Sequence, residues 1–533
     1  MQLRSSGMRL VRFTEKYRVW IGVAVIAGCG LLPIAGFASS QNILLIIADD
    51  YGVDSSSLYN SNTSASLPPT PNIESLARSG VLFRNGYANP VCSPSRACLI
   101  TGRHGFRTGI GDVITGPGSA VLSASEFTLP EAFSANAALG YQLAQFGKWH
   151  LAMGPNTPNS IGGWPHFAGS LPGALVDYSD WTKTVNGIST PNYTNYATTD
   201  VVNDAVAWIQ ARGTQPWFAW VAFNAPHTPL HKPPSSLCPH YATLPGTQVD
   251  INRRPRLYFE AMVEAMDTEI GRLLGAVNRK NTEIIFLGDN GTTGSVIQPP
   301  FPSTRAKDTL YEGGIKVPFI ISGPIVNQPG RTNDTPVHAV DLFATVLELA
   351  GINVASTAPA GVTIDSQSLL PTLTNTATLD RCSFSEKFGT NTPSPDGRAL
   401  RNAQFKLLRF DDGTEEFYDL VADPIESTNL LAGSLTDPQR AHYYSLEMKL
   451  GSFENKVAGP VITQVARTEE TMAISVAQTS GIRYGLWRAT TLDPLAWAPA
   501  ANTIVTTNGT VVTLTDTQAG GSSAFYRVTA TSQ

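Results

Sequence analysis

The sequence predicts an α/β protein in which a largely parallel sheet lies between layers of helices. Asn42 to Ile47 is a continuous apolar run with β-branched members, which is typical of a strand buried on both faces. Strand-like runs at 216–223 and 282–287 alternate with helical patterns at 199–212 and 257–277. Buried strands that alternate with helices indicate a parallel sheet covered by those helices.

Composition supports a large globular protein. The chain has 533 residues, too many for one ordinary domain, and is 42% hydrophobic but only 15% charged. The net charge is −5, and no basic run occurs beyond the N-terminal segment. This charge pattern argues against a nucleic-acid partner.

Residues 1–38 have the pattern of a signal peptide. Five basic residues precede an apolar stretch from Val19 to Ile34, and Gly36-Phe37-Ala38 offers a cleavage site. A membrane anchor is one alternative, although Gly and Pro interrupt the stretch, which is short for a membrane span. A lipobox-like Ile26 to Cys29 is another and would leave a lipidated Cys29. We therefore expect export to the periplasm, the outer surface or the medium, without a stable membrane span.

Cys92 to Gly102 is the stretch around which the chain is organised. Pro94 suits the first turn of a helix, so Cys92 is expected at a helix N-terminus, where unpaired N–H groups favour negative charge. Arg96, one turn on, points back to the same place. This is a suitable setting for a nucleophile, and a buried, inert cysteine at a helix start is the equal alternative.

Polar residues follow several predicted strands. Asp49-Asp50 follows the strand at 42–47, and Asp289-Asn290 follows the strand at 282–287. Sites in open α/β sheets gather at the carboxyl ends of strands, and adjacent carboxylates repel unless a cation lies between them. Carboxylate and amide oxygens suit Ca²⁺ or Mg²⁺. Taken singly, each pair also fits a polar strand end, a helix cap or an Asn-Gly turn.

Basic residues occur at further strand exits. Lys148 and His150 follow a strand at 141–146, and alternation places both on one side, where they could bind an anion and handle a proton. A surface strand end is the alternative for this pair. His227 lies between two prolines after the strand at 216–223, and His231 is a nearby competitor.

Six elements in order resemble the sulfatase family. Cys92-x-Pro94-Ser95-Arg96, followed by Leu99 and Thr101-Gly102, resembles the sulfatase signature. The other elements that match, in the family's order, are Asp49-Asp50, Lys148/His150, His227, Asp289-Asn290 and Lys307. The resemblance covers about residues 41–455 and favours His227 over His231.

The resemblance implies an alkaline-phosphatase-like fold and a modified nucleophile. In the family, a separate maturation enzyme oxidises the cysteine to Cα-formylglycine, so Cys92 is expected to be modified. One divalent cation is implied, Ca²⁺ with Mg²⁺ as the alternative. The implied metal ligands are Asp49, Asp50, Cys92, Asp289 and Asn290. The implied catalytic residues are Cys92, Arg96, Lys148, His150, His227 and Lys307.

The implied function is a secreted sulfuric ester hydrolase acting on an aryl or carbohydrate sulfate ester, with a sulfated glycan among the candidate substrates. A formylglycine-dependent phosphonate or phosphate ester hydrolase is the alternative with the same fold. A non-catalytic glycan-binding surface protein is the alternative from a different class. Turnover that requires Cys92 distinguishes these enzymes from a binding protein.

The expected domains are a sulfatase domain at 41–455 and an appended β-sandwich module at 456–533. The α/β part is expected to run to about 390, followed by a small antiparallel subdomain at about 391–455 with a hairpin at 405–420. Residues 152–200 are expected to be a long loop region that selects the substrate, and 336–351, including His338, an amphipathic helix. Export also permits a disulfide between Cys238 and Cys382.

Overall fold

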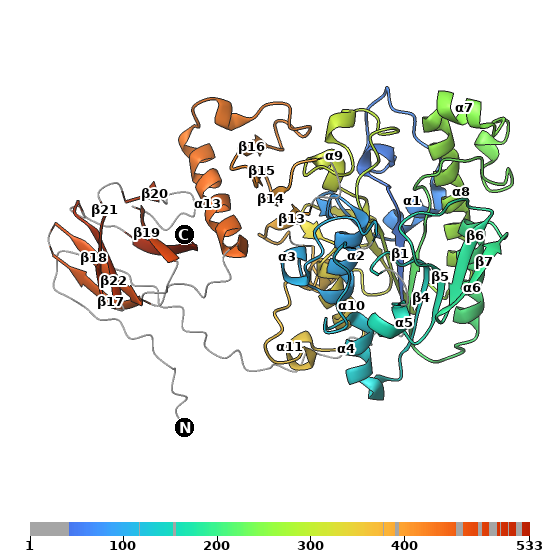
Figure 1. Cartoon of the computed structure of the whole chain (residues 1–533), viewed down its shortest axis with the longest axis horizontal. Coiled ribbons are helices and arrows are strands. Elements are labelled where there is room, and N and C mark those ends of the chain that lie inside the picture. Colours follow the sequence, from blue (N-terminus) through green and yellow to red (C-terminus); the bar gives the residue numbers. More distant parts are fainter. Residues whose placement is uncertain are drawn as a thin grey trace. The chain divides into compact units, whose positions relative to one another are not determined.

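The computed structural model describes residues 42–533 except 117, 153–155, 377, 390–393, 455–461, 469, 478–481, 490–497, 501–502, 510, 519–524 and 533. The predicted signal peptide at 1–38, with Cys29, lies outside the described residues. Among the described residues, no helix has both the length and the apolar character needed to cross a membrane. The chain forms two compact units, one ending at Asn429 and another that includes Leu430 to Gln533 (Figure 1).

A ten-stranded mixed sheet organises the first unit. In spatial order its strands are β11 (Arg331–Asn333), β2 (Gly80–Phe83), β10 (Phe319–Ser322), β9 (Thr282–Gly288), β1 (Asn42–Ala48), β8 (Trp217–Ala222), β4 (Gln142–Lys148), β5 (Phe167–Ser170), β6 (Trp181–Val185) and β7 (Ile188–Tyr193). The five neighbours from β9 to β5 run parallel. β10 and β6 flank them antiparallel, so the predicted mixed, mostly parallel sheet is confirmed.

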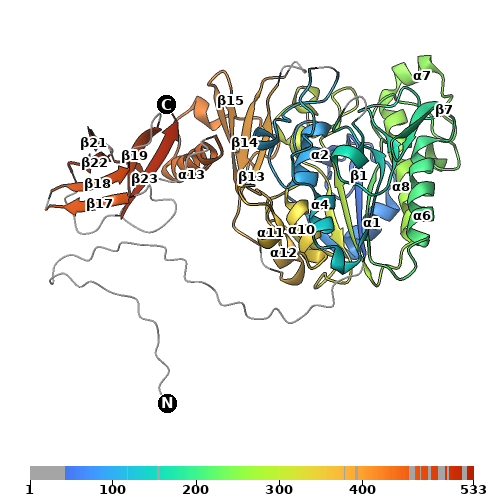
Figure 2. The same ribbon diagram turned by 60° about the horizontal axis from the view of Figure 1, so that its bottom comes forward.

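The sheet is buried on both faces because its central strands are apolar throughout. Alternate residues of β1 enter different cores, with Ile43, Leu45 and Ile47 on one face and Leu44 and Ile46 on the other. The first face is covered by α2 (Cys92–Thr101), α4 (Leu129–Ala135), α10 (Asp341–Leu349) and α12 (Leu370–Thr374). The second is covered by α1 (Pro71–Arg78), α6 (Ala197–Gln210) and α8 (Pro255–Gly275), as Figure 2 shows.

Shorter elements connect these layers. They are the helices α3 (Gly105–Thr108), α5 (Pro158–Ile161), α7 (Gln248–Arg253), α9 (Glu312–Ile315) and α11 (Val354–Thr357), and the 3-10 turns η1 (Val53–Ser55), η2 (Ala137–Leu139), η3 (Pro239–Tyr241) and η4 (Ser303–Arg305). The expectation that 152–200 is a loop region was wrong, because it contains β5 and the β6–β7 hairpin. The side chains of β7 are almost all exposed, and such an edge strand needs few apolar residues.

Two further expectations need correction. His338 lies in the short strand β12 (Val337–His338), which pairs with β3 (Gly86–Tyr87), and helix α10 begins only at Asp341. The Asp341 carboxylate accepts the backbone N–H of His338, which caps the chain before the helix starts. Cys238 is a buried free thiol, so the expected disulfide with Cys382 is not formed.

A four-stranded antiparallel sheet completes the first unit. Its strands are β13 (Ser383–Lys387), β14 (Gly397–Arg401), β15 (Phe405–Phe410) and β16 (Glu415–Asp419). The predicted hairpin is formed by β15 and β16, and Gly413 supplies the positive φ of 88° that its turn needs. Strand β13 holds the chain that precedes α2, because the Ser385 hydroxyl donates to the carbonyl of Ala88 and the Glu386 N–H donates to the Asn89 side chain.

The second unit contains η5 (Leu430–Ala432), helix α13 (Asp437–Glu454) and two antiparallel sheets. One sheet has the order β17 (Ile462–Arg467), β18 (Met472–Ala477), β22 (Val511–Asp516) and β21 (Thr503–Asn508). The other has the order β20 (Ala498–Pro499), β19 (Ile482–Ala489) and β23 (Phe525–Ser532). Ile474 and Leu514 of the first sheet share a core with Leu486 and Val528 of the second, as in a β-sandwich.

The buried carboxyl group of Glu386 makes the stability of the first unit depend on pH. Its Oε1 accepts the Phe106 N–H at 2.9 Å, whereas Oε2 has no hydrogen-bond partner among the described residues. Burial raises the pKa of Glu386 to about 7 from 4.5. Because the pKa is higher in the folded state, the contribution of Glu386 to stability is fully present below about pH 4.5 and is lost as the pH rises through 7.

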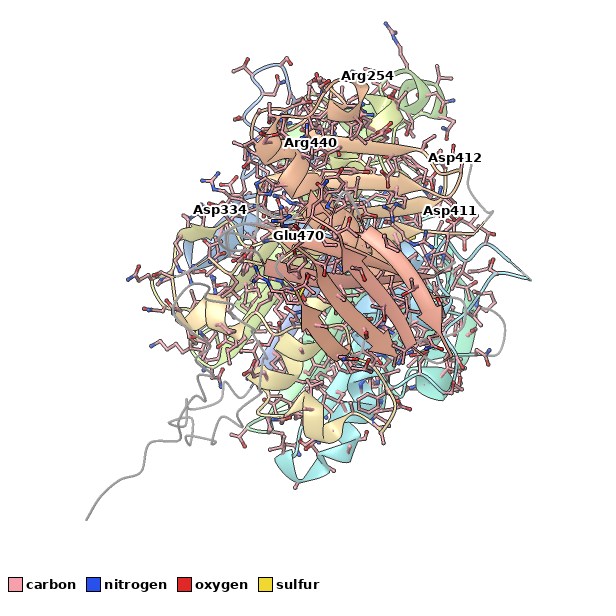
Figure 3. All side chains as sticks on the ribbon, turned by 90° about the vertical axis from the view of Figure 1, so that its left-hand side faces the viewer. Arg254, Asp334, Asp411, Asp412, Arg440 and Glu470 are labelled. Atoms are coloured by element: carbon pink, nitrogen blue, oxygen red, sulfur yellow. The ribbon has the colours of Figure 1, made fainter. Side chains whose placement is uncertain are left out.

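We expect Glu386→Gln to be more stable than the wild-type protein at pH 8, by up to about 3 kcal/mol, and nearly equal to it at pH 4.5. Glutamine keeps the acceptor oxygen for Phe106 but cannot ionise. Urea unfolding at both pH values measures the difference. Glu470→Gln, at the exposed residue labelled in Figure 3, is the control. A gain of equal size at both pH values would contradict the prediction.

Candidate active site

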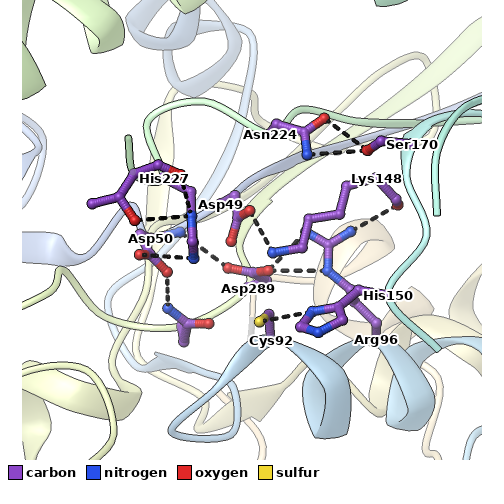
Figure 4. A network of polar contacts seen from close by, with 12 residues as sticks. Asp49, Asp50, Cys92, Arg96, Lys148, His150, Ser170, Asn224, His227 and Asp289 are labelled. Carbon is purple, nitrogen blue, oxygen red and sulfur yellow. Dashed lines mark hydrogen bonds and ion pairs between the residues drawn. The ribbon is translucent and has the colours of Figure 1, made fainter. Parts of the chain in front are cut away.

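Polar side chains converge where the parallel strands of the large sheet end. Asp49 follows β1 and Asp289 follows β9, whose last residues, Ala48 and Gly288, are paired in register. Lys148 is the last residue of β4. Because parallel neighbours end at the same edge, all these side chains reach one place, which Figure 4 shows beside the first turn of α2.

Three ion pairs, two of them fully buried and one partly buried, join the strand ends to neighbouring elements. The Lys148 ammonium lies 2.6 Å from the Asp49 carboxylate, and the Arg96 guanidinium lies 2.7 Å from that of Asp289. Lys307, from the loop before α9, lies 2.5 Å from Asp50. Arg96 also donates to the carbonyl oxygen of Lys148 at 3.1 Å, which links two of the pairs.

The chain turns sharply to place these carboxylates. Asp50 has a φ of 64°, a left-handed conformation that is uncommon for residues other than glycine. Its backbone N–H donates to Oδ1 of Asp289 at 3.2 Å. Gly147 precedes Lys148 and has a φ of 85°. A Cβ added at Gly147 would lie 1.9 Å from the Ala222 carbonyl oxygen, so the close approach of β4 to β8 requires glycine at this position.

The site shifts the pKa values of Asp49 and Asp50 in opposite directions. Burial and the Asp289 carboxylate raise the pKa of Asp49 well above its usual value, although Lys148 opposes them. Burial also acts on Asp50, but Lys307, His227 and Lys148 outweigh it and lower the pKa of Asp50. Burial and the neighbouring carboxylate thus disfavour the ionised form of Asp49, and a cation bound there would favour it.

The residues present fit a divalent cation. Two buried oxygens, Oδ1 of Asp49 and Oδ1 of Asn290, have no hydrogen-bond partner in the described part of the chain. Donor atoms of Asp49, Cys92 and Asp289 all lie within 4.8 Å of one another. The Asn290 amide donates to Asp50 at 2.8 Å, so Asn290 joins the same cluster. Buried carboxylate and amide oxygens of this kind are hard ligands.

Cys92 begins helix α2, as predicted, and faces a histidine. Its Sγ lies 3.1 Å from Nδ1 of His150, and the side chain is 1% exposed. His150 has a φ of 56° and lies beyond the end of β4, so it reaches the site through a left-handed turn and not through strand alternation with Lys148. Burial, with Lys148 nearby, lowers the pKa of His150 well below its usual value.

The two candidate histidines after β8 have different surroundings. Nε2 of His227 lies 3.8 Å from the Asp50 carboxylate, within the site. Burial lowers the pKa of His227 to about 3, although Asp50 opposes it. His231 instead lies 2.9 Å from the Tyr196 hydroxyl and packs against the Tyr178 ring. The contacts of His231 are therefore those of a residue that stabilises the fold.

The structure brings together all ten residues predicted for the site, while their individual roles remain predictions. It adds three that sequence reasoning missed. Ser170, the last residue of β5, exchanges hydrogen bonds with Asn224 at 3.1–3.2 Å beside Lys148 (Figure 4). The Tyr178 hydroxyl lies 2.7 Å from the carbonyl oxygens of Asn224 and His227. Asn224 follows strand β8, so its position at a strand end could have identified it as a site residue. Ser170 could not be identified in this way, because its strand β5 lies in the stretch that was expected to be a loop.

Comparisons with known proteins agree with this geometry. The family model described as Sulfatase matches residues 41–352, and the one described as N-sulphoglucosamine sulphohydrolase, C-terminal, matches 305–450. Arylsulfatase J of Mus musculus is 29% identical over 346 residues, covering 60% of this chain and 54% of the relative. The ulvan-active sulfatase of Formosa agariphila is 29% identical over 399 residues, covering 68% of this chain and 72% of the relative.

A solved structure shares the architecture. The crystal structure of Ps i-CgsB in complex with k-i-k-neocarrahexaose has a TM-score of 0.65 and 25% identity, and the match covers 78% of this chain and 93% of that one. The alkaline-phosphatase-like α/β sandwich expected from the sequence is thereby confirmed. With a sulfatase family model matching residues 41–352, more than half of its length, this chain belongs to the sulfatase family of sulfuric ester hydrolases.

Proposed function

We propose that this protein is an exported, cation-dependent sulfatase that removes sulfate from a sulfated glycan and uses formylglycine made from Cys92. The observation that carries the proposal is the position of Cys92. Its Sγ lies at the start of α2, 3.1 Å from His150 and within 4.8 Å of carboxylate oxygens of Asp49 and Asp289. A nucleophile at that point would meet fixed positive charge and a proton acceptor.

The cationic side chains suit a sulfate ester. Such an ester carries one negative charge that repels nucleophiles, and more negative charge builds up on its oxygens during cleavage. Arg96, Lys148 and Lys307 would bind and orient the sulfate group with fixed positive charge. A divalent cation, for which we propose Ca²⁺, would be held by Asp49, Asp50, Asp289 and Asn290 with residue 92, and would supply charge neutralisation at the sulfate oxygens.

Protons must move at two points of the reaction. Lys307 and His227 lie on the Asp50 side of the site, where the Lys307 ammonium would supply the proton to the departing alcohol and His227 would assist it. His150 lies on the other side, against residue 92, and would accept a proton there. Formylglycine at position 92 would supply, as its hydrate, two hydroxyl groups, one for attack on sulfur and one for the later release of sulfate.

The relatives support a glycan as the substrate class. One is named for activity on ulvan, and the solved neighbour is described as a complex with k-i-k-neocarrahexaose. We also propose export through the segment at 1–38 and maturation by a formylglycine-generating enzyme. Aryl sulfates remain the alternative substrate.

We expect Cys92→Ala to abolish turnover of sulfated oligosaccharides, because alanine cannot be converted into the nucleophile. Cys98→Ser is the control, since Cys98 lies on the same helix and its Sγ accepts a hydrogen bond from the Asn89 amide. Mass spectrometry of the tryptic peptide Asn85 to Arg96 from the native host should show an aldehyde in place of the thiol. Unmodified Cys92 in active protein would sink the proposed mechanism.

A matched panel of esters tests the substrate. We expect sulfated oligosaccharides to be cleaved faster than 4-nitrophenyl sulfate, and both faster than the corresponding phosphate esters, because a second phosphate charge needs more positive compensation. Faster cleavage of a phosphate or phosphonate ester would favour the alternative hydrolase. Binding of the oligosaccharide that survives Cys92→Ala, with no turnover by the wild-type protein, would favour the binding protein.

We expect Ca²⁺ to raise the melting temperature of the wild-type protein and to leave that of Asp50→Asn unchanged. A ligand present at 100 times its Kd adds about 2.7 kcal/mol to stability. Asp334→Asn, at an exposed position, serves as the control and should respond like the wild-type protein (Figure 3). Differential scanning fluorimetry with Ca²⁺, Mg²⁺ and a chelator measures the shifts. An equal shift for Asp50→Asn would remove Asp50 from the ligand set.

A further inference from the structure

The imidazole ring of His150 is held by contacts that determine which nitrogen carries its hydrogen. Nε2 lies 3.0 Å from the carbonyl oxygen of Ile114, and a carbonyl oxygen can only accept. In the neutral ring Nε2 therefore carries the hydrogen, and Nδ1, 3.1 Å from the Sγ of Cys92, presents its lone pair to residue 92. The other neutral tautomer, with its hydrogen on Nδ1, would place an N–H donor against residue 92 in place of an acceptor.

The acceptor for Nε2 is itself attached to the helix of the nucleophile. The backbone N–H of Ile114 donates to the hydroxyl of Ser93 at 3.2 Å, and Ser93 directly follows Cys92 in α2. The ring is thus oriented relative to α2. Its backbone is also fixed, because the His150 N–H donates to the carbonyl of Leu171 at 3.1 Å.

The chain from Leu171 to Tyr178 covers the ring on a further side, at Gly173. A Cβ added at Gly173 would lie 2.3 Å from both Cε1 and Nε2 of His150, far inside contact distance. The φ of Gly173 is not in the left-handed region, so its backbone conformation would accept another residue. The need for glycine therefore comes from the ring. The Tyr178 hydroxyl, 2.7 Å from carbonyl oxygens of Asn224 and His227, keeps the end of this chain in place.

We propose that Gly173 is a positioning residue of the sulfatase reaction, because its missing side chain leaves the room in which the ring of His150 can present Nδ1 to residue 92. The inference rests on the proposed function. Neither the ring nor the covering chain can move freely. The ring is hydrogen-bonded to the Ile114 carbonyl, and the chain is held by the hydrogen bonds of Leu171 and Tyr178. An added methyl group must displace the ring.

Gly173→Ala tests the proposal. We expect kcat to fall by about 100-fold, the loss typical of a reacting group misplaced by 1 Å, with KM changed by less than about threefold. Formylglycine content, measured on the peptide Asn85 to Arg96, should equal that of the wild-type protein. Gly275→Ala is the matched control, since a Cβ at this last residue of α8 meets nothing within 4 Å.

A double-mutant cycle with His150→Ala separates positioning from general damage. Truncating the ring removes the atoms that the added methyl group would strike. We therefore expect Gly173→Ala to lower both kcat and the melting temperature in the wild-type background, and to change neither in the His150→Ala background. Losses that persist in the absence of the ring, or an unchanged kcat for Gly173→Ala, would overturn the proposal.

A crystal structure of Gly173→Ala provides a measurement independent of turnover. It should show the His150 ring displaced and its contact with the Ile114 carbonyl lost, and an undisplaced ring would overturn the proposal. If the wild-type protein cleaves no sulfate ester, the proposed function fails, whereas the melting-temperature cycle and the crystal structure still decide whether Gly173 positions the ring.

Discussion

Three carboxylates are buried at the carboxyl ends of the parallel strands, where their charge is compensated by three cationic side chains. Lys148 pairs with Asp49, Arg96 with Asp289 and Lys307 with Asp50. An isolated buried charge costs several kcal/mol, so each partner depends on the other. These pairs join β1, β4, β9, α2 and the loop before α9. The same contacts that hold the elements together therefore also bring three cationic side chains to the site where the proposed sulfate ester would bind.

The parallel arrangement explains why so many polar groups meet. Five neighbouring strands run in one direction, so the residues at their ends share one edge of the sheet. The interiors of these strands are apolar, and polar groups occur where the strands stop. Asp50 and His150 reach the site with left-handed backbones, which cost about 1–3 kcal/mol each and persist because the packed surroundings hold them.

Much of this arrangement was predictable from local patterns. The apolar run at 42–47 identified the central strand, and the Pro94 pattern identified the start of α2. Polar pairs directly after apolar runs identified Asp49, Asp50, Asp289 and Asn290. The β6–β7 hairpin was missed because its exposed edge strand lacks apolar alternation. His338 was misplaced because Asp341, which stops the extended chain and begins α10, acts through a side-chain contact that no periodicity reveals.

The sequence by itself determined which chemical groups stand at the strand ends, since apolar runs and the polar residues after them are local features. Only the tertiary structure decided which groups meet. Lys148 and Asp49 are 99 positions apart, and Lys307 and Asp50 are 257 apart. Gly173 follows His150 within an apparently unstructured stretch, yet its backbone lies against the ring. Such contacts depend on strand order and close packing, which join distant segments and leave no periodic trace in the sequence.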